Sequence, residues 1–276
     1  MSSSRIDLAA KYVRLASRMG PRRGFQLLWQ RGHHQFVKPL QRSESRVPLP
    51  DGKGHVWLRP GTSDWPVFEQ LFLHQEYDAA GTPQQQGIAR RYADACASGI
   101  RPLIIDLGAN TGLSSLFFAH RWPGATVVAI EPDERNFALL AKNVASCGNI
   151  EALHAAIWDH PTTLAIVDPS ADAWKVSVSE SVTSTTRVPA ITVAEVLRRF
   201  GHSEIFIAKI DIEGAESALF RSHTEWVDNA DLLIIEFHDW LYPGRCPSKN
   251  FLRAAMRVDR EVLIHGENLF CFRLLA

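Results

Sequence analysis

Apolar strands and amphipathic helices alternate along most of the chain, and this order limits the fold more than any other feature. Segments with the spacing of helices, such as "LSSLFFAHRW" and "ERNFALLAKNVASCG", separate the strands. Alternation of this kind, with nearly continuous apolar strands, predicts a mostly parallel sheet covered by helices on both faces. "EVLIHG" and "NLFCFRLL" could add a closing antiparallel pair. The five strands expected before that pair are "PLIIDLG", "TVVAIEP", "IEALHAAIW", "IFIAKIDIEG" and "DLLIIEFHDW".

The turn after the first of these strands has the composition of a ligand-binding loop. Its pattern places Asp106, Gly108, Asn110 and Gly112 at alternate positions before a helix. Glycine allows positive φ and close approach of a ligand to the backbone, and asparagine is the next most tolerant residue. The free amides of the following helix could receive a carboxylate. The GxGxxG spacing of dinucleotide-binding loops is absent.

A single acidic residue indicates what kind of ligand this loop holds. Glu131 lies 19 residues after Gly112, at the end of the second expected strand. A carboxylate at that place can accept hydrogen bonds from both hydroxyls of an adenosine ribose. The loop and Glu131 together therefore predict a nucleoside ligand.

Several blocks of the sequence resemble one family. "IIDLGANTG", "VVAIEPDERNFALLAKNV", "IAKIDIEGAE" and "IIEFH" are similar to blocks of the FkbM family of S-adenosylmethionine-dependent methyltransferases, and they occur in the same order. "LRPGTSD" and Glu76-Tyr77 also resemble an upstream stretch of the family, so the likeness runs roughly from His55 to His238. The resemblance implies a class I methyltransferase (Rossmann-like) fold with a seven-stranded sheet whose last strand is antiparallel. It also implies transfer of a methyl group, usually to a hydroxyl of a sugar or a polyketide-like natural product.

The same resemblance assigns the residues around the cofactor, S-adenosylmethionine. It places the glycine loop at the methionine end, Glu131 at the ribose and the end of the third strand beside the adenine. The cofactor-binding residues implied are Asp106, Gly108, Asn110, Thr111, Gly112, Glu131, Pro132, Asn136, Ala156 and Asp211.

Acidic residues and one histidine follow two neighbouring strands. Asp211 and Glu213 come after the fourth strand. Glu236 and His238 come after the fifth, two residues apart and so on one face of an extended strand. In an open α/β sheet the reacting centre lies beyond the carboxyl ends of the strands, near the reversal of strand order. A hydroxyl acceptor benefits from a general base, so these four residues are the catalytic candidates.

Among the four, His238 is slightly favoured over Asp211 as the base, because an unperturbed histidine titrates at about pH 6.5. Glu216 also follows the fourth strand. It fits a member of this acidic group and, equally well, a carboxylate that stabilises the first turn of a helix. Asp211, Glu213, Glu236 and His238 also offer hard ligands that a divalent metal could use. Their spacing alone does not establish a metal site, and the prediction includes none.

Two other functions stay open from the residues alone. A nicotinamide-dependent oxidoreductase would use a similar fold, but the missing GxGxxG pattern counts against it. A non-catalytic nucleoside-binding accessory protein would not need acidic residues at both strand ends, and this chain has them. The leading prediction is therefore an O-methyltransferase, with a small-molecule or glycan acceptor that the sequence does not identify.

The first part of the chain is basic and has a different organisation. Ten lysines and arginines lie at or before Arg46, against Asp7 and Glu44. Apolar residues from Ile6 to Ala16 recur at helical spacing, and Gly20-Pro21 ends this pattern. The polar loop "SESRVPLPDGKG" marks a boundary between a basic helical segment, residues 1–50, and the methyltransferase domain, residues 51–276. The basic helix predicts contact with an anionic partner or membrane surface, or packing on the domain.

Composition bounds the remaining possibilities. The formal net charge is +0, so the chain as a whole does not have the charge of a nucleic-acid binder. No apolar stretch approaches the roughly 20 residues needed to span a membrane, and Arg14 and Arg18 interrupt any secretory signal. The four cysteines are far apart and form no CxxC pair. We expect reduced thiols and a cytoplasmic protein.

Overall fold

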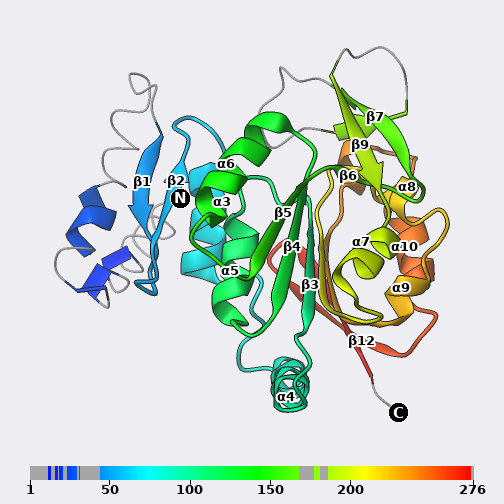
Figure 1. Cartoon of the computed structure of the whole chain (residues 1–276), viewed down its shortest axis with the longest axis horizontal. Coiled ribbons are helices and arrows are strands. Elements are labelled where there is room, and N and C mark those ends of the chain that lie inside the picture. Colours follow the sequence, from blue (N-terminus) through cyan, green and yellow to red (C-terminus); the bar gives the residue numbers. More distant parts are fainter. Residues whose placement is uncertain are drawn as a thin grey trace. The chain divides into compact units, whose positions relative to one another are not determined.

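The computed structural model describes residues 12–13, 16–17, 19–20, 24–29, 31, 44–167, 177–180 and 186–274. The chain divides into two compact units, Met1–Gln75 and Glu76–Ala276 (Figure 1). Residues 24–29 are helical. Most of the basic helix expected before Gly20 lies outside the described residues. The boundary expected after residue 50 stays a prediction.

The first unit contains a hairpin and a helix. Strands β1 (Ser45–Pro48) and β2 (His55–Leu58) pair in antiparallel register, with Ser45 opposite Leu58. The prediction of a loop over residues 43–54 is wrong for Ser45–Pro48, which form β1, and only residues 49–54 between the two strands are a loop. Helix α3 (Asp64–Glu69) continues as a π-helical turn, η1 (Gln70–His74).

The second unit is built on a seven-stranded sheet in the order β12-β13-β11-β10-β3-β4-β5. Strands β3, β4, β5, β10 and β11 are parallel, whereas β13 is antiparallel to both of its neighbours, β11 and β12. The predicted closing antiparallel pair and the class I methyltransferase topology are therefore confirmed. The strand bounds are β3 Leu103–Leu107, β4 Thr126–Glu131, β5 Ile150–His154, β10 Ile205–Ile210, β11 Ala230–Glu236, β12 Arg260–His265 and β13 Asn268–Arg273.

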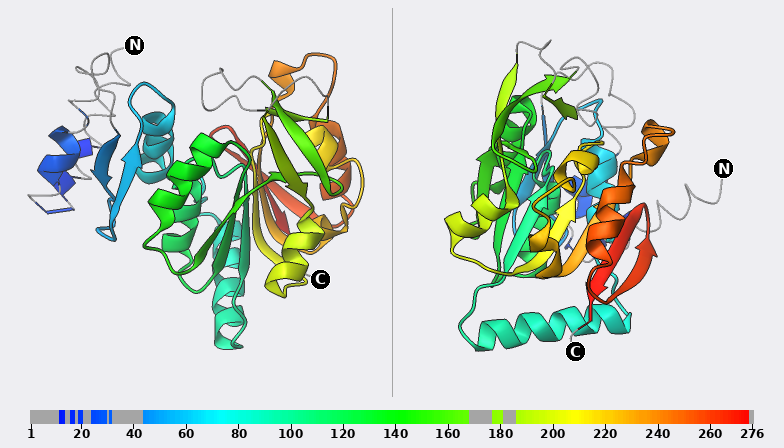
Figure 2. Two further views of the ribbon diagram at one scale, coloured as in Figure 1. Left: turned by 45° about the horizontal axis from the view of Figure 1, so that its top comes forward. Right: turned by 90° about the vertical axis from the view of Figure 1, so that its right-hand side faces the viewer.

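Helices cover both faces of this sheet (Figures 1 and 2). Apolar residues of α7, α9 and α10 pack in one buried core with alternate residues of β3, such as Ile105. Helices α5 and α6 follow β3 and β4 and cover the opposite face (Figure 1). The helices of this unit are α4 Pro83–Ala97, α5 Leu113–Arg121, α6 Glu134–Val144, α7 Val193–Phe200, α8 Glu216–Leu219, α9 Glu225–Asp228, the short 3-10 helix η2 Asp239–Leu241 and α10 Ser248–Ala255.

A smaller sheet begins directly after β5, the third strand of the large sheet in chain order. Its strands are β6 (Ala156–Ile157), β7 (Thr162–Val167), β8 (Ser177–Ser179) and β9 (Arg187–Ile191), in the order β6-β9-β7-β8. Within the described ranges, no helix has the length and apolar character required to cross a membrane.

The order of the large sheet determines where a ligand can bind. From β3 the chain adds β4 and β5 on one side, and then returns to place β10 and β11 on the other. The carboxyl ends of β3 and β10 therefore flank the point at which strand order reverses. Loops diverge at such a point and leave a crevice for a ligand.

Candidate active site

The glycine loop after β3 has the backbone conformation that its composition predicts. Gly108, Asn110 and Gly112 have φ values of 78°, 48° and 81°, all in the left-handed region. A Cβ atom on Gly108 would overlap the backbone carbonyl oxygen of Asp211, so any larger residue there would push β10 away. Asn110 is the one residue of the three that carries a side chain, in agreement with its tolerance of this conformation.

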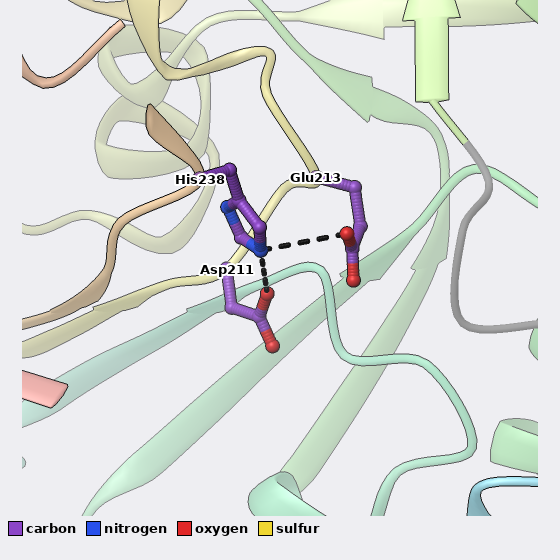
Figure 3. A group of neighbouring side chains, drawn as sticks. All are labelled: Asp211, Glu213 and His238. Carbon is purple, nitrogen blue, oxygen red and sulfur yellow. Dashed lines mark ion pairs between the residues drawn. The ribbon is translucent and has the colours of Figure 1, made fainter. Parts of the chain in front are cut away.

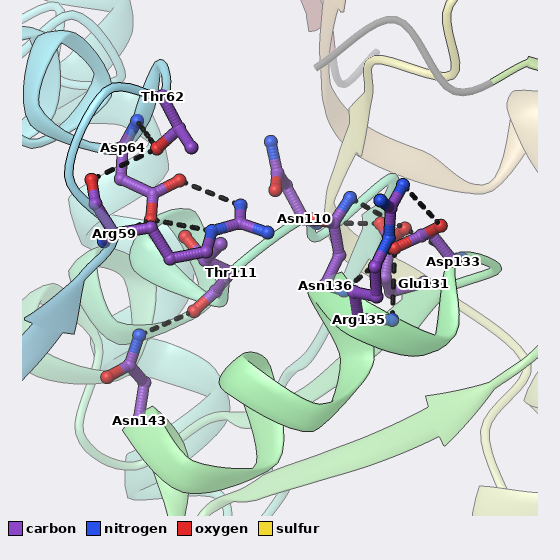
Figure 4. Close-up of polar contacts among 10 residues, drawn as sticks. All are labelled: Arg59, Thr62, Asp64, Asn110, Thr111, Glu131, Asp133, Arg135, Asn136 and Asn143. Carbon is purple, nitrogen blue, oxygen red and sulfur yellow. Dashed lines mark hydrogen bonds and ion pairs between the residues drawn. The ribbon is translucent and has the colours of Figure 1, made fainter. Parts of the chain in front are cut away.

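Glu131 at the end of β4 is held by three donors (Figure 4). Its oxygens accept hydrogen bonds from the backbone N–H of Asn110 at 2.8 Å, the backbone N–H of Asp133 at 2.9 Å and Asn136 Nδ2 at 3.4 Å. The side chain is only 4% exposed. Burial raises the pKa of Glu131 to about 7, although the three donors favour the charged form. The carboxylate is thus fixed in orientation before any ligand arrives.

A cavity lies at this end of the sheet, and most of the expected cofactor residues line it. Gly108, Asn110, Glu131, Pro132, Asn136, Ala156 and Asp211 all contribute to its wall. Sequence reasoning missed several apolar wall residues, because no motif marks them. They are Ile130, Ala155, Val178, Ile212 and Ala215.

Three expected cofactor residues are not part of this wall and support the loop instead. Asp106 is buried, and its Oδ2 accepts hydrogen bonds from the hydroxyls of Ser114 and Ser115 on α5, each at 2.6 Å. The carbonyl oxygen of Thr111 accepts a hydrogen bond from Asn143 Nδ2 at 2.8 Å (Figure 4). Gly112 is the N-cap of α5. Whether these residues contact the cofactor stays a prediction.

Lys209 on β10 is a functional candidate that sequence reasoning missed. It is 2% exposed, and its Nζ donates a hydrogen bond to the carbonyl oxygen of Gly108 at 2.7 Å. Nζ also lies 3.3 Å from Asp106 Oδ1 and 3.4 Å from Asp211 Oδ2. Burial alone would lower the pKa of Lys209, but the two carboxylates outweigh it and raise the pKa. A lysine inside the apolar run "IFIAKI" was the signal that could have revealed it.

The four residues predicted to be catalytic lie together at the ends of β10 and β11. His238 Nε2 is 3.4 Å from Glu213 Oε2, 3.7 Å from Asp211 Oδ1 and 3.9 Å from Glu236 Oε1. Figure 3 shows the imidazole directed between Asp211 and Glu213. The cluster adjoins the cavity, because Asp211 and Glu213 line its wall.

Glu216 fixes the orientation of the histidine. Its Oε1 lies 2.9 Å from His238 Nδ1, and the two side chains are 1% and 3% exposed. Glu216 is also the first residue of α8, so both sequence interpretations of this carboxylate fit its position. Burial lowers the pKa of His238, but the hydrogen bond to Glu216 and the nearby charges of Asp211 and Glu213 raise it overall to about 9.

The pKa values of two carboxyl groups in the cluster are also raised. Burial, followed by the charge of Asp211, raises the pKa of Glu213 to about 8 and that of Glu236 to about 7. Glu213 has a φ of 52°, an uncommon value for a residue other than glycine. The site therefore concentrates negative charge and gives it a fixed geometry.

Tyr77 is a second residue whose place the sequence did not specify. Its ring stacks on Phe118, with centroids 5.5 Å apart, and meets the edge of Phe117. Burial raises the pKa of its hydroxyl, on which the charges of Lys209 and Asp211 also act. Glu76-Tyr77 resembled a family stretch in the sequence, and this position beside the charged groups gives the tyrosine a physical context.

The sheet order, the glycine loop and the buried carboxylate at the end of β4 define a class I methyltransferase. Residues 106–262 match the family described as "Methyltransferase FkbM domain". The matched region exceeds half of the chain, and the protein belongs to this family. S-adenosylmethionine is the cofactor that the family implies.

Individual relatives match only short parts of the chain. The chain is 27% identical over 101 residues to the methyltransferase sdnD of Sordaria araneosa, covering 36% of this chain and 33% of that protein. It is 38% identical over 60 residues to the tRNA1(Val) (adenine(37)-N6)-methyltransferase of Pedobacter heparinus, covering 21% of this chain and 26% of that protein. The chain thus matches about a third or less of the length of these two relatives.

Solved structures of other methyltransferases are similar at low sequence identity. An rRNA methylase from Streptococcus thermophilus has a TM-score of 0.37 and 10% identity, with coverage of 63% of this chain and 88% of that chain. Fibrillarin from Aeropyrum pernix, in complex with S-adenosyl-L-methionine, has a TM-score of 0.38 and 11% identity, with coverage of 67% and 74%.

Proposed function

We propose that the protein is an S-adenosylmethionine-dependent O-methyltransferase that methylates a hydroxyl of a sugar or a polyketide-like natural product. One observation carries the proposal. A single cavity is lined by the ribose-binding candidate Glu131 and also by Asp211 and Glu213 of the acidic cluster. A cofactor bound at Glu131 and an acceptor held by the cluster would therefore share one site.

The residues around the cavity fit the polar groups of the cofactor. Glu131 Oε2 accepts one hydrogen bond, from the backbone N–H of Asn110, and keeps a second lone pair for a ribose hydroxyl, whereas Oε1 already accepts from the N–H of Asp133 and from Asn136 Nδ2. Asn110 Oδ1 is buried and has no hydrogen-bond partner within the part of the chain that the structure describes. A buried acceptor without a partner is costly, so a donor group of the bound cofactor would satisfy it. When bound, the cofactor supplies an electrophilic methyl group on a sulfonium.

The protein's contribution is to hold the acceptor and to take its proton. Positioning of two reactants can account for much of an enzyme's rate. Asp211 Oδ1 is buried and accepts no hydrogen bond from the described residues, so it can accept one from an acceptor hydroxyl. Asp211 and His238, whose Oδ1 and Nε2 atoms lie 3.7 Å apart, are the predicted receivers of that proton. Because the pKa of His238 is raised to about 9, the histidine can take this role only in the fraction of molecules in which it is neutral.

Calorimetry and mass spectrometry test the proposal in sequence. The purified protein should bind S-adenosylmethionine and S-adenosylhomocysteine and should not bind NAD. Incubation of a library of sugars and hydroxylated natural products with cofactor labelled on the methyl group should then give an O-methylated product. NAD binding without adenosylmethionine binding would support the oxidoreductase alternative. Methyl transfer to nitrogen, carbon or RNA would contradict the proposed acceptor class, and cofactor binding without any turnover would support a non-catalytic accessory role.

A further inference from the structure

Three side chains of the cluster have the spacing of ligands around one metal ion. One ligand atom from each of Asp211, Glu213 and His238 lies within 4.8 Å of the other two. Atoms that bind a hard cation lie roughly 2.0–2.6 Å from it, so two of them are at most about 5 Å apart. A single ion could therefore contact all three side chains without movement of the backbone.

His238 supplies an observation that is independent of the carboxylates. Its side chain is 3% exposed, and Nε2 is directed into the cluster (Figure 3). Nε2 makes no hydrogen bond to any described residue. Its distances to the carboxylate oxygens, 3.4–3.9 Å, exceed the roughly 2.7–2.9 Å of a charge-assisted hydrogen bond. The gap is too wide for a shared proton, and an ion placed between these atoms would satisfy them.

The other ring nitrogen of His238 is already occupied. Glu216 Oε1 lies 2.9 Å from Nδ1, so a proton on Nδ1 can be donated to this carboxylate. Histidines that bind metals commonly donate their second ring N–H to a carboxylate, which fixes the tautomer and the ring orientation. In this tautomer the lone pair of Nε2 is directed toward Asp211 and Glu213, which is unfavourable unless a cation lies between them.

The charges around His238 also favour a bound cation. Four carboxyl groups lie within 4.0 Å of its ring nitrogens, those of Asp211, Glu213, Glu216 and Glu236. Lys209 is near Asp211 but also pairs with Asp106, and so it does not balance this charge alone.

We propose that Asp211, Glu213 and His238 bind a hard divalent cation, Mg²⁺ or Mn²⁺, with Glu216 as the positioning residue for the histidine. Three protein ligands leave about three positions of an octahedral ion open. Since Asp211 and Glu213 also line the cofactor cavity, those positions would be available to the acceptor. The proposal rests on the methyltransferase function and narrows its acceptor class to molecules with two neighbouring oxygen ligands, such as a vicinal diol.

The ion would activate the acceptor hydroxyl as a Lewis acid. With the ion bound, Asp211 and His238 serve as its ligands and no longer as the proton receivers, so the O–H bond breaks and its proton passes to the carboxylate of Glu236. The acceptor oxygen then forms a bond to the methyl carbon. The bond between that carbon and sulfur breaks, and its electron pair stays on sulfur, which gives neutral S-adenosylhomocysteine and a methyl ether.

Direct ion binding provides a test that does not depend on activity. Full-length protein treated with EDTA and desalted should bind one Mn²⁺ per chain, measured by loss of the free-ion signal in electron paramagnetic resonance. Glu213→Gln and His238→Gln should each weaken binding by on the order of 10–100-fold or more. Pulsed measurements on the wild type should show coupling to an imidazole nitrogen that is absent in His238→Gln. Glu151→Gln, which removes an exposed carboxylate on β5, should bind Mn²⁺ like the wild type.

S-adenosylhomocysteine binding by the same samples separates this proposal from the proposed function. A protein that binds S-adenosylhomocysteine but no Mn²⁺ at millimolar concentration contradicts the metal site and leaves the methyltransferase function standing. Equal Mn²⁺ affinity in the wild type and both site variants also contradicts it. Mn²⁺ binding without S-adenosylhomocysteine binding supports the metal site and contradicts the proposed function.

Discussion

The ammonium of Lys209 donates a hydrogen bond to the carbonyl oxygen of Gly108 at 2.7 Å, and this contact joins β10 to the glycine loop after β3. Both strands flank the point at which the order of the sheet reverses. The backbones approach so closely there that a Cβ on Gly108 would overlap the Asp211 carbonyl oxygen. Lys209 therefore holds together two neighbouring segments that both line the cavity.

Replacement of this lysine should destabilise the fold. Lys209→Met leaves the buried Asp106 and its neighbour Asp211 without their cation, and loss of one partner of a buried ion pair costs about 3–5 kcal/mol. Urea unfolding of Lys209→Met and of the exposed Lys249→Met measures the difference. If the two variants unfold at the same urea concentration as the wild type, the buried pairs contribute no net stability.

Cofactor affinity should depend on pH through Glu131. The ribose hydroxyls donate hydrogen bonds to the ionised carboxylate, and burial raises its pKa to about 7. Because the protonated form must lose its proton before it binds, affinity should fall about tenfold per unit as the pH drops below 7, and should be constant above it. Dissociation constants for S-adenosylhomocysteine between pH 5.5 and 8.5 measure this dependence.

Glu131→Gln is the control for that pH dependence. It should bind more weakly by about 1–3 kcal/mol, because one good acceptor is lost, and its affinity should no longer change through pH 7. A wild-type affinity that is constant over the whole range would contradict the assignment of Glu131 as the ribose-binding group.

The sequence predicted the fold well because the relevant signals are local. Continuous apolar strands such as "PLIIDLG" need burial on both faces, and the conformational tolerance of Gly108 and Asn110 is a property of single residues. The edge at which Asp211 and His238 meet follows from parallel strand direction alone. Each of these inferences needs only the order of the elements along the chain.

Contacts between side chains from separate elements were harder to predict from the sequence. In the sequence, Lys209 is a charged residue inside an apolar strand. The structure places β3 beside β10, and this brings Asp106 Oδ1 to 3.3 Å from Lys209 Nζ. Glu216 was ambiguous because a carboxylate at the start of a helix has a local explanation, and its contact with His238 spans 22 residues. Packing distances between strands and helices decide such contacts, and the sequence contains no pattern for them.

The basic segment at the start of the chain should influence the acceptor and not the cofactor. Its excess positive charge predicts contact with an anionic partner, an anionic membrane surface or the acceptor itself. A variant that lacks residues 1–43 begins just before β1 and keeps the hairpin of β1 and β2. It should bind S-adenosylhomocysteine within about twofold of the wild type and turn over its acceptor more slowly. Equal turnover by the two proteins would show that the segment has no such role.

Substitution of the predicted proton receivers should slow chemistry more than it weakens cofactor binding. Loss of a general base costs about 10²–10⁴-fold in rate. His238→Ala should show this loss in single-turnover methylation with nearly unchanged S-adenosylhomocysteine affinity, because His238 is not part of the cavity wall. Asp211→Asn should slow the reaction and also weaken cofactor binding, since Asp211 lines the cavity. Wild-type rates in both variants would move the role of base to Glu213 or Glu236.

Glu216 and Glu225 provide a matched pair that separates a helix-stabilising carboxylate from a positioning residue. Each is the first residue of a four-residue helix, α8 and α9, but Glu216 is buried against His238 whereas Glu225 is exposed. Favourable interaction with the start of a helix is worth about 0.3–1 kcal/mol, so both Glu→Gln substitutions should lower stability by similar small amounts if this is their only role.

If Glu216 also orients the histidine, its substitution should have a second effect. Glu216→Gln should lower the single-turnover rate and the Mn²⁺ affinity by about 10–100-fold, since the second hydrogen bond of a ligating histidine is lost, while Glu225→Gln changes neither. Circular dichroism and S-adenosylhomocysteine affinity confirm that both variants are folded. Equal rates and Mn²⁺ affinities in the two variants would show that Glu216 acts only as a carboxylate at the start of α8.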